Sequence, residues 1–267
     1  MVFWKGKVAF ITGGSSGIGA AFAALVVDRG GSAVIVDINE DAAAAVVAAL
    51  GDRALFVRAD VSCEADVTRA VDLAIGRFGR IDLLHNNASI LRRNENIEDM
   101  TIDDFRAVVE INTIGSFLCA RAVVPVMRRS GTGTIVNMSS RGGLRGQGHT
   151  LAYSTTKAGL VSFTRGLAEQ LKPAGIKVCA LSVGLVETAM TRGGAYLAQA
   201  KSEGRYVFQP EEMASAIAFI SEYPDNSGAI YEYFGGEAGP EMRRLGDFSY
   251  DVMNVNLRTP QGQPFRS

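Results

Sequence analysis

Short apolar runs alternate with longer amphipathic stretches along most of the chain. Seven runs rich in β-branched residues are typical of strands, at residues 7–12, 33–37, 54–59, 81–88, 133–139, 176–182 and 229–234. Helices are predicted between them, at 17–29, 40–50, 64–78, 102–129, 153–171 and 211–221. The strands are apolar nearly throughout, as burial on both faces requires. The alternation therefore predicts an α/β fold: a doubly wound parallel sheet of about seven strands with helices on both faces.

The end of the chain departs from this alternation. No Pro- or Ser-rich linker interrupts the pattern before Gly236, so residues 1–236 are predicted to form one domain. Residues 237–267 are rich in Gly, Pro, Arg and Asn, as in RTPQGQPFRS. This composition predicts a C-terminal tail that is a loose arm, or one that is ordered only at a subunit interface.

Composition and charge exclude several classes of function. Of the 267 residues, 47% are hydrophobic and 21% are charged, a normal balance for a globular domain. The formal net charge of −1 gives no electrostatic reason to expect nucleic acid or an anionic membrane as a partner. Cys63, Cys119 and Cys179 include no C-x-x-C pair, so neither a disulfide framework nor a metal site is predicted. We expect reduced core thiols in a cytoplasmic protein without a signal peptide.

The stretch VAFITGGSSGIGAA, residues 8–21, permits two interpretations. In the first, GGSSG is the G-x-S-x-G turn of a hydrolase, and Ser15 is the nucleophile. In the second, the turn between strand and helix wraps the pyrophosphate of a dinucleotide. Three glycines then supply a tight turn, close backbone approach and close helix packing: Gly13, Gly17 and Gly19. The N-terminus of the helix favours the anion.

The rest of the chain favours the dinucleotide. A hydrolase of this kind needs a histidine base, and the chain offers only His85 and His149, without an HGGG-like oxyanion stretch. Asp37 ends the second predicted strand about 20 residues after the glycine turn, where a carboxylate accepts hydrogen bonds from the adenosine ribose. The alternative for Asp37 is an ordinary helix cap.

Tyr153 and Lys157 lie four residues apart in LAYSTTKAG, on one face of a predicted helix. A phenol with an ordinary pKa of about 10 is a poor acid or base at neutral pH. A nearby ammonium and an oxidised nicotinamide cation would stabilise the phenolate and lower that pKa. Alone, Y-x-x-x-K is usually a surface pair, but with the glycine turn upstream it indicates an acid/base centre.

Further polar residues are placed to complete such a centre. Ser140 lies at the carboxyl end of GTIVNMSS, where open parallel sheets bind ligands, and its hydroxyl is a candidate to hold the substrate oxygen. Ser139 is a weaker candidate, and either serine alternatively caps the next segment. Asn112 is polar within an apolar helical stretch, for which a satisfied core amide is the other interpretation.

These motifs together resemble the short-chain dehydrogenase/reductase family. They are TGGSSGIG, DV at Asp60, NNA at Asn86 to Ala88, Asn112, Ser140 and YSTTK at Tyr153 to Lys157, in family order between about Lys5 and Gly236. The resemblance implies a Rossmann-type domain over 1–236 that binds the dinucleotide and catalyses the reaction, with a homotetramer or homodimer as the assembly. It also implies that Tyr153 is the acid/base, Lys157 lowers its pKa and binds ribose, Ser140 positions the substrate oxygen and Asn112 holds a proton-relay water.

The resemblance further implies which residues contact the cofactor. Asp60 and Val61 would meet the adenine, Asn87 and Ala88 would flank the adenosine ribose, and Val186 with Thr188 would hold the nicotinamide amide. The full set expected around NAD is Gly13, Ser15, Ser16, Gly17, Ile18, Gly19, Asp37, Ile38, Asp60, Val61, Asn87, Ala88, Tyr153, Lys157, Val186 and Thr188.

The chain departs from the family pattern in three places. Ser89 stands where the family usually has the glycine of NNAG, and Val183 stands where it usually has the proline of a Pro-Gly pair. The loop over the nicotinamide is therefore expected to be less rigid. The tail beyond Gly236 extends past the point where family members commonly stop.

The substrate is expected beside the catalytic residues. The predicted contacts are Ser140, Gly142, Leu144, His149, Tyr153, Gly184 and Leu185, with residues 190–206 as a mobile lid hinged at Gly193-Gly194. Four arginines also lie in loops near the strand ends and permit an acidic substrate, the alternative being solvated surface side chains: Arg92, Arg93, Arg141 and Arg145.

The sequence thus predicts an enzyme that transfers a hydride between NAD and a secondary alcohol or ketone. The rival enzyme is an NADP-dependent carbonyl reductase, against which Asp37 argues, because its carboxylate would face the 2′-phosphate. The non-enzymatic alternative is a nucleotide-sensing protein on the same fold. Substrate identity is not predicted.

Overall fold

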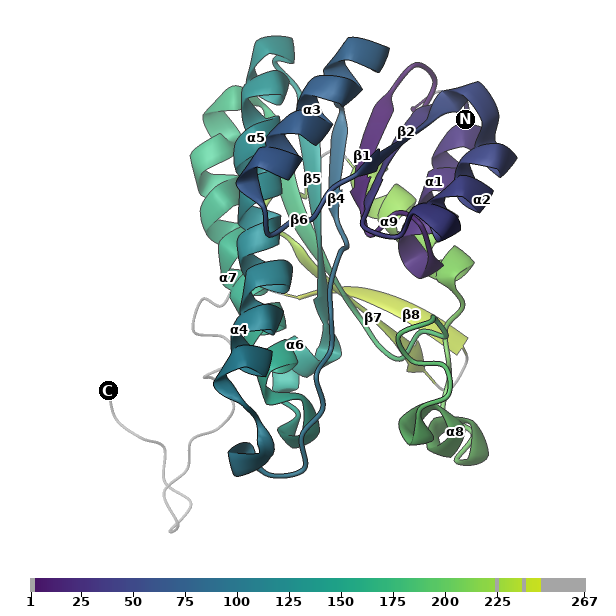
Figure 1. Ribbon diagram of the computed structural model, residues 1–267, viewed down its shortest axis with the longest axis vertical. Coiled ribbons are helices and arrows are strands. Elements are labelled where there is room, and N and C mark those ends of the chain that lie inside the picture. The colour runs from purple at the N-terminus through teal and green to yellow at the C-terminus, as the bar shows by residue number, and fades with distance from the viewer. Residues whose placement is uncertain (1–2, 224–225, 237–238, 246–267) are drawn as a thin grey trace.

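An eight-stranded sheet runs through the centre of the molecule in the computed structural model, which describes residues 3–223, 226–236 and 239–245 (Figure 1). The strands are β1 (Val8–Thr12), β2 (Ser32–Asp37), β3 (Ala54–Arg58), β4 (Leu83–Asn86), β5 (Gly133–Ser140), β6 (Ile176–Val183), β7 (Ile230–Gly236) and β8 (Gly239–Leu245). The α-helices are α1 (Gly17–Asp28), α2 (Glu40–Leu50), α3 (Glu64–Phe78), α4 (Ile102–Val109), α5 (Gly115–Ser130), α6 (Arg141–Arg145), α7 (Leu151–Leu171), α8 (Ala195–Ser202) and α9 (Pro210–Glu222).

The strand order is β3-β2-β1-β4-β5-β6-β7-β8, and every pair is parallel except β7 with β8. The chain moves outward from β1 to β3 and then returns to place β4 on the other side of β1. This reversal opens a crevice at the carboxyl ends of β1 and β4, where doubly wound sheets bind ligands. Figure 1 shows α4, α6 and α8 gathered at that same end of the sheet.

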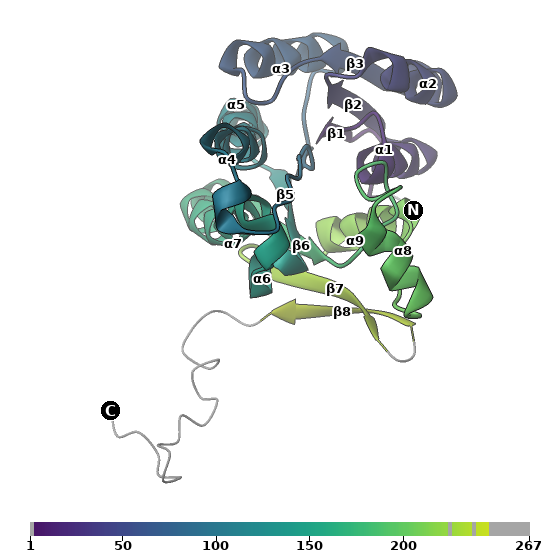
Figure 2. The same cartoon turned by 60° about the horizontal axis from the view of Figure 1, so that its bottom comes forward.

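Helices cover both faces of the sheet, as the apolar strands require (Figure 2). On one face α1, α2 and α9 pack around buried side chains that include Phe22, Val26 and Ile217. On the other face α3, α5 and α7 pack around a second cluster that includes Val67 and Val123. The predicted doubly wound α/β fold is therefore confirmed. The two clusters hold the strand ends in place, and some of their members, such as Val183 and Val61, also line the cavity at those ends.

The sheet has eight strands, so the predicted count of seven is wrong. Residues 239–245, which we expected in a loose tail, form β8 and pair antiparallel with β7. Met242 of β8 packs against the core, and Arg243 contacts Glu232 on β7, so side-chain contacts as well as the backbone ladder hold this strand. The rest of the predicted tail, 246–267, lies outside the described residues.

The long helix expected over 102–129 is divided in two. A π-helical turn, Glu110–Ile114, joins α4 to α5 and carries Asn112. Within the described ranges, Ile102–Ser130 is the stretch long and apolar enough to meet the criteria for a membrane-spanning helix. Core helices meet the same criteria, and buried side chains of α5 such as Val123 and Met127 pack into the second cluster.

Candidate active site

The turn between β1 and α1 is built from glycines whose geometry other residues would disturb. Gly13 and Gly17 have φ angles of +62° and +52°, in the left-handed region that favours glycine. A Cβ on Gly19 would lie 2.3 Å from the Gly13 carbonyl oxygen and 2.9 Å from Asn87 Nδ2. The first turn of α1 therefore approaches the loop and the end of β4 at backbone distance. Such packing directs the helix N-terminus at the crevice, as an anion-binding turn requires.

Asn87 fastens the glycine turn to the neighbouring strand. Its Nδ2 donates to the carbonyl oxygens of Thr12 and Gly13 at 2.9 and 3.1 Å. Thr12 Oγ1 in turn accepts from the backbone N–H groups of Asn87 and Ala88, each at 3.0 Å. These bonds join the ends of β1 and β4 across the point where the strand order reverses.

The hydrolase interpretation of the turn is excluded by the surroundings of Ser15. Its Oγ donates to Asp37 Oδ2 at 2.6 Å. His85 is fully buried on β4 against Phe22, and burial lowers its pKa to about 3. His149 is exposed and contacts Tyr196. No Ser–His pair of the kind a nucleophile needs is formed at Ser15.

Asp37 is held in place at the end of β2. Its Oδ2 also accepts from the Ser15 backbone N–H at 3.1 Å, and its Oδ1 accepts from the Asn39 N–H at 3.1 Å. The carboxylate thus closes the loop before α2 while it lines the crevice. The helix-cap alternative for Asp37 is partly correct, because its carboxylate accepts from the N–H of the N-cap residue Asn39. The N-cap bond of α2 itself is made by the side chain of Asn39.

A single cavity of about 1020 Å³ joins the glycine turn to the predicted catalytic residues. Most of the residues predicted to contact the cofactor line it: Gly13, Ser16, Gly17, Ile18, Asp37, Ile38, Asp60, Val61, Asn87, Ala88, Tyr153, Lys157, Val186 and Thr188. Two members of the predicted set do not line it. Ser15 is buried and acts through Asp37, and Gly19 is buried in α1, where it permits close packing.

Tyr153 lies on α7 beside the ends of β4 and β5. Burial raises the pKa of Tyr153 above its usual value, and hydrogen bonds with the hydroxyls of Ser140 and Ser89 oppose that rise only in part. The physical reason is that, in the protein without a cofactor, desolvation of the phenolate outweighs the two hydroxyl dipoles. The lowered pKa predicted from the sequence depends on a bound nicotinamide cation as well as on the ammonium, so it stays a prediction for the complex with cofactor.

Lys157 is buried one turn after Tyr153. Its Nζ donates to the Met138 carbonyl oxygen at 2.8 Å and lies 5.4 Å from the centroid of the Tyr153 ring. Burial lowers the pKa of Lys157 to about 7. The side chain therefore reaches the cavity from beneath the tyrosine, where a charged ammonium is costly.

The structure separates the two candidate serines. Ser139 is buried and its Oγ donates to the Lys157 carbonyl oxygen at 2.8 Å, so it joins β5 to α7. Ser140 lines the cavity next to Tyr153, and its Oγ accepts from the Gly142 N–H at 3.1 Å. Ser140 thus both begins α6 and faces the cavity. Ser89, which we noted only as a departure from the family pattern, also lines the cavity and contacts the phenol.

Asn112 is fully buried in the π-helical turn. Its Oδ1 accepts from the Ile90 N–H at 2.8 Å, and its Nδ2 donates to the Ile90 carbonyl oxygen at 3.0 Å and to Thr156 Oγ1 at 3.1 Å. The carboxamide therefore fixes the strand-end loop that carries Ser89 against α7. This arrangement matches the satisfied core amide, and the proton-relay role stays a prediction.

Six of the residues predicted to contact the substrate line the cavity, and their contact with a substrate stays a prediction: Ser140, Gly142, His149, Tyr153, Gly184 and Leu185. Leu144 is not part of this lining. It packs instead against the cluster formed by Val161, Ala180 and Ile230. Residue 144 lies on α6, so the helical turn directs it to the sheet while its neighbours face the cavity.

The segment predicted to be a lid, residues 190–206, contains α8, a helix that was not predicted from the sequence. Main-chain hydrogen bonds join the residues that precede this segment to the residue that follows it. Phe208 N donates to Leu185 O, and Glu187 N donates to Phe208 O, each at 2.9 Å. Tyr196 of α8 lines the cavity and lies 5.7 Å, centroid to centroid, from the ring of His149. The mobility of this segment stays a prediction.

The cysteines are free, and one of them is not a core residue. Cys119 and Cys179 are buried, and burial raises the pKa of both thiols to about 12. Cys63 is exposed before α3, so the expectation of three core thiols is wrong at this position. Over the described ranges, no group of three or more His, Cys, Asp or Glu residues is arranged to hold a metal ion.

Comparisons with known proteins agree with this geometry. The family model described as short chain dehydrogenase matches residues 7–195. The chain is 38% identical over 239 residues to a cis-4-hydroxycyclohexanecarboxylate dehydrogenase of Sinomonas cyclohexanicum, covering 86% of this chain and 96% of the relative. It is 36% identical over 233 residues to a 3-alpha-(or 20-beta)-hydroxysteroid dehydrogenase of Mycobacterium tuberculosis (strain ATCC 25618 / H37Rv), covering 86% and 89%. A solved structure of 3-ketoacyl-(acyl-carrier-protein) reductase from Brucella melitensis complexed with NADH matches with a TM-score of 0.81 at 34% identity, covering 86% and 97%.

Proposed function

The chain belongs to the short-chain dehydrogenase/reductase family, a family of hydride-transfer oxidoreductases, and from this premise we propose that it is an NAD-dependent dehydrogenase of secondary alcohols. One observation carries the proposal: Tyr153, with Ser140 and Ser89 at its hydroxyl and Lys157 beneath it, lines the same cavity as the glycine turn and Asp37. The cytoplasmic location and the homotetramer stay predictions.

The residues of the cavity fit a nicotinamide dinucleotide. The positive-φ glycines leave backbone space for a pyrophosphate, and Asp37 offers a fixed carboxylate to ribose hydroxyls. When bound, an oxidised nicotinamide would accept the hydride from the carbinol carbon, and its positive charge would lower the pKa of the tyrosine. The protein's own part is to remove the proton. The Tyr153 phenolate takes it from the substrate hydroxyl, while Ser140 holds the substrate oxygen beside it.

Two relatives suggest the first substrates to test, since their names specify a hydroxycyclohexanecarboxylate and hydroxysteroids. We expect NADH fluorescence to develop when the protein and NAD are mixed with at least one member of a panel of cyclic, aromatic and aliphatic secondary alcohols. Tight NAD binding without turnover of any alcohol, or reduction of any matching ketone, would favour the nucleotide-sensing alternative.

NAD is expected to be preferred over NADP by at least about tenfold in kcat/KM, equivalent to about 1.4 kcal/mol. The Asp37 carboxylate would lie next to the 2′-phosphate of NADP. Arg58 is paired with Asp37 in the register of β2 and β3, but its Nε lies 2.9 Å from Glu40 Oε1. Arg58, the basic side chain nearest to Asp37 in register, is therefore paired with Glu40 rather than placed to bind a 2′-phosphate.

The double variant Asp37→Ala/Ile38→Arg tests this assignment. It removes the repulsion and adds a phosphate partner at Ile38, a position 64% exposed on the cavity rim, so the preference should narrow or reverse. Asp41→Ala, on the exposed side of α2, is the matched control and should leave the ratio unchanged. Equal efficiencies of the wild type with both cofactors would show that Asp37 does not select the dinucleotide.

A further inference from the structure

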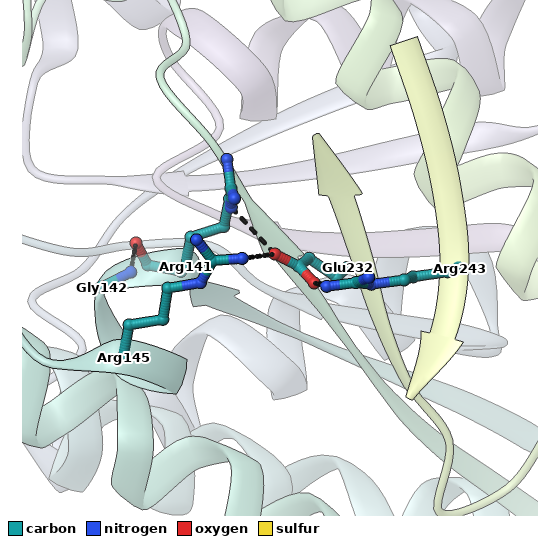
Figure 3. Close-up of polar contacts among 6 residues, drawn as sticks. Arg141, Gly142, Arg145, Glu232 and Arg243 are labelled. Carbon is teal, nitrogen blue, oxygen red and sulfur yellow. Dashed lines mark hydrogen bonds and ion pairs between the residues drawn. The ribbon is translucent and has the colours of Figure 1, made fainter. Parts of the chain in front are cut away.

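Three arginines surround one buried carboxylate at the substrate end of the cavity (Figure 3). Glu232 lies on β7 with its side chain 2% exposed. Its Oε1 accepts from Arg141 Nε at 2.8 Å and from Arg145 Nη2 at 3.4 Å, and its Oε2 accepts from Arg243 Nε at 2.9 Å. We call these four residues the Glu232 cluster. One negative charge faces three positive charges, so the cluster has a net positive charge.

Arg141 and Arg145 keep hydrogen-bond donors that Glu232 does not accept. Arg141 gives only its Nε, and within the described part of the chain neither of its terminal nitrogens has a hydrogen-bond partner. Figure 3 shows that end of the side chain extending away from Glu232. Arg145 contributes a single long bond and is 58% exposed. Both arginines therefore keep donors in the fork geometry that suits a carboxylate.

The cluster borders the reaction site. Arg141 follows Ser140 directly in the chain, and Arg141 and Arg145 both line the cavity. The cavity is also lined by Arg93 and Arg205, whose guanidinium carbons lie 5.7 and 4.9 Å from the centroid of the Tyr196 ring. Arg205 is paired with Glu203, its Nε lying 2.8 Å from Oε2. The acidic side chains in the cavity lining are Asp37 and Asp60, both at the adenosine end. The charged side chains that line the opposite end of the cavity are therefore all basic.

We propose that the cavity selects alcohols and ketones that carry a carboxylate, which binds between the terminal nitrogens of Arg141 and the guanidinium of Arg145. This inference rests on the proposed function and adds the substrate's charge class to it. Glu232 is the positioning residue, because it holds Arg141 in place from behind. An anion at this site offsets the mutual repulsion of the arginines, which one carboxylate leaves uncompensated.

A purely structural role is the competing explanation. The Glu232 cluster joins α6, β7 and β8, and a buried carboxylate needs positive partners whatever the substrate is. A purely structural role predicts the same kcat/KM for a substrate that carries a carboxylate and for an uncharged substrate of the same shape. The test therefore compares two ligands of the same shape in one protein.

The experiment measures kcat/KM with NAD for 4-hydroxycyclohexanecarboxylate and for its uncharged carboxamide. We expect the wild type to prefer the acid by about tenfold or more, as charge-assisted recognition of a carboxylate implies. Arg145→Gln should remove most of that preference through a higher KM for the acid, with the amide changed by less than about twofold. Arg145→Lys keeps the charge and should retain a preference for the acid. Arg129→Gln, an exposed arginine at the end of α5, is the matched control and should behave as the wild type.

A binding measurement separates this inference from the proposed function. Calorimetry with NADH present compares cyclohexanecarboxylate with cyclohexanecarboxamide, neither of which has a hydroxyl to oxidise. Tighter binding of the carboxylate by the wild type, weakened in Arg145→Gln, supports the anion site even where neither alcohol is turned over. Equal binding of the two ligands, or an equal loss for both in Arg145→Gln, overturns it.

Discussion

Tyr153→Phe is expected to lower kcat by about 100-fold or more while the affinity for NAD stays within about twofold. The substitution removes the hydroxyl that contacts Ser140 and Ser89 and keeps the ring that covers Lys157. Only the proton-transfer group is lost, so the cavity should keep its shape. Steady-state kinetics and a fluorescence titration with NADH measure the two quantities separately.

The matched control for this variant is Tyr223→Phe, which removes the hydroxyl of an exposed tyrosine at the end of α9, away from the cavity lining. It should retain wild-type turnover. A Tyr153→Phe enzyme that kept a third of the wild-type kcat would contradict the assignment of Tyr153 as the acid/base.

Lys157→Met is expected to change activity and stability in opposite directions. Turnover should fall by about 100-fold or more, because the ammonium that favours the phenolate is lost. The free energy of unfolding at pH 6 should rise by about 1 to 3 kcal/mol, since an apolar side chain replaces a buried charge. Kinetics and urea unfolding measure the two effects, and Lys172→Met, at an exposed lysine beyond α7, is the control.

The stability effect has a definite dependence on pH. Burial lowers the pKa of Lys157 from 10.5 in a model peptide to about 7 in the folded protein. Below about 7 the lysine is charged in both states and the folded state bears the full cost of burial. Between these two values the unfolded state binds more protons, so wild-type stability rises with pH relative to the variant. The advantage of Lys157→Met should therefore shrink from pH 7 to pH 9, and a constant difference over that window would contradict the burial argument.

The sequence determined the order of the elements and the half of the cavity that we predict to bind the cofactor. Strands buried on both faces leave a continuous apolar run, so β1 to β7 were placed within two or three residues from their composition alone. The glycine turn and Asp37 were found for the same reason, because backbone approach and a strand-end carboxylate need particular residue types at fixed spacing. These features depend on residues that are close together in the chain, so the sequence alone reveals them.

The tertiary structure decided what depends on contacts between distant residues. β8 is held by its pairing with β7 and by Glu232, which a Gly- and Arg-rich stretch does not reveal. The pKa of Tyr153 follows from burial and from Ser89, which lies 64 positions earlier in the chain. Arg141 and Arg145 looked like surface arginines until β7 placed Glu232 between them and β8. The electrostatic potential beside Arg141 and Arg145 is the sum of charges on α6, β7 and β8. Its sign and strength therefore depend on how the folded chain brings these elements together.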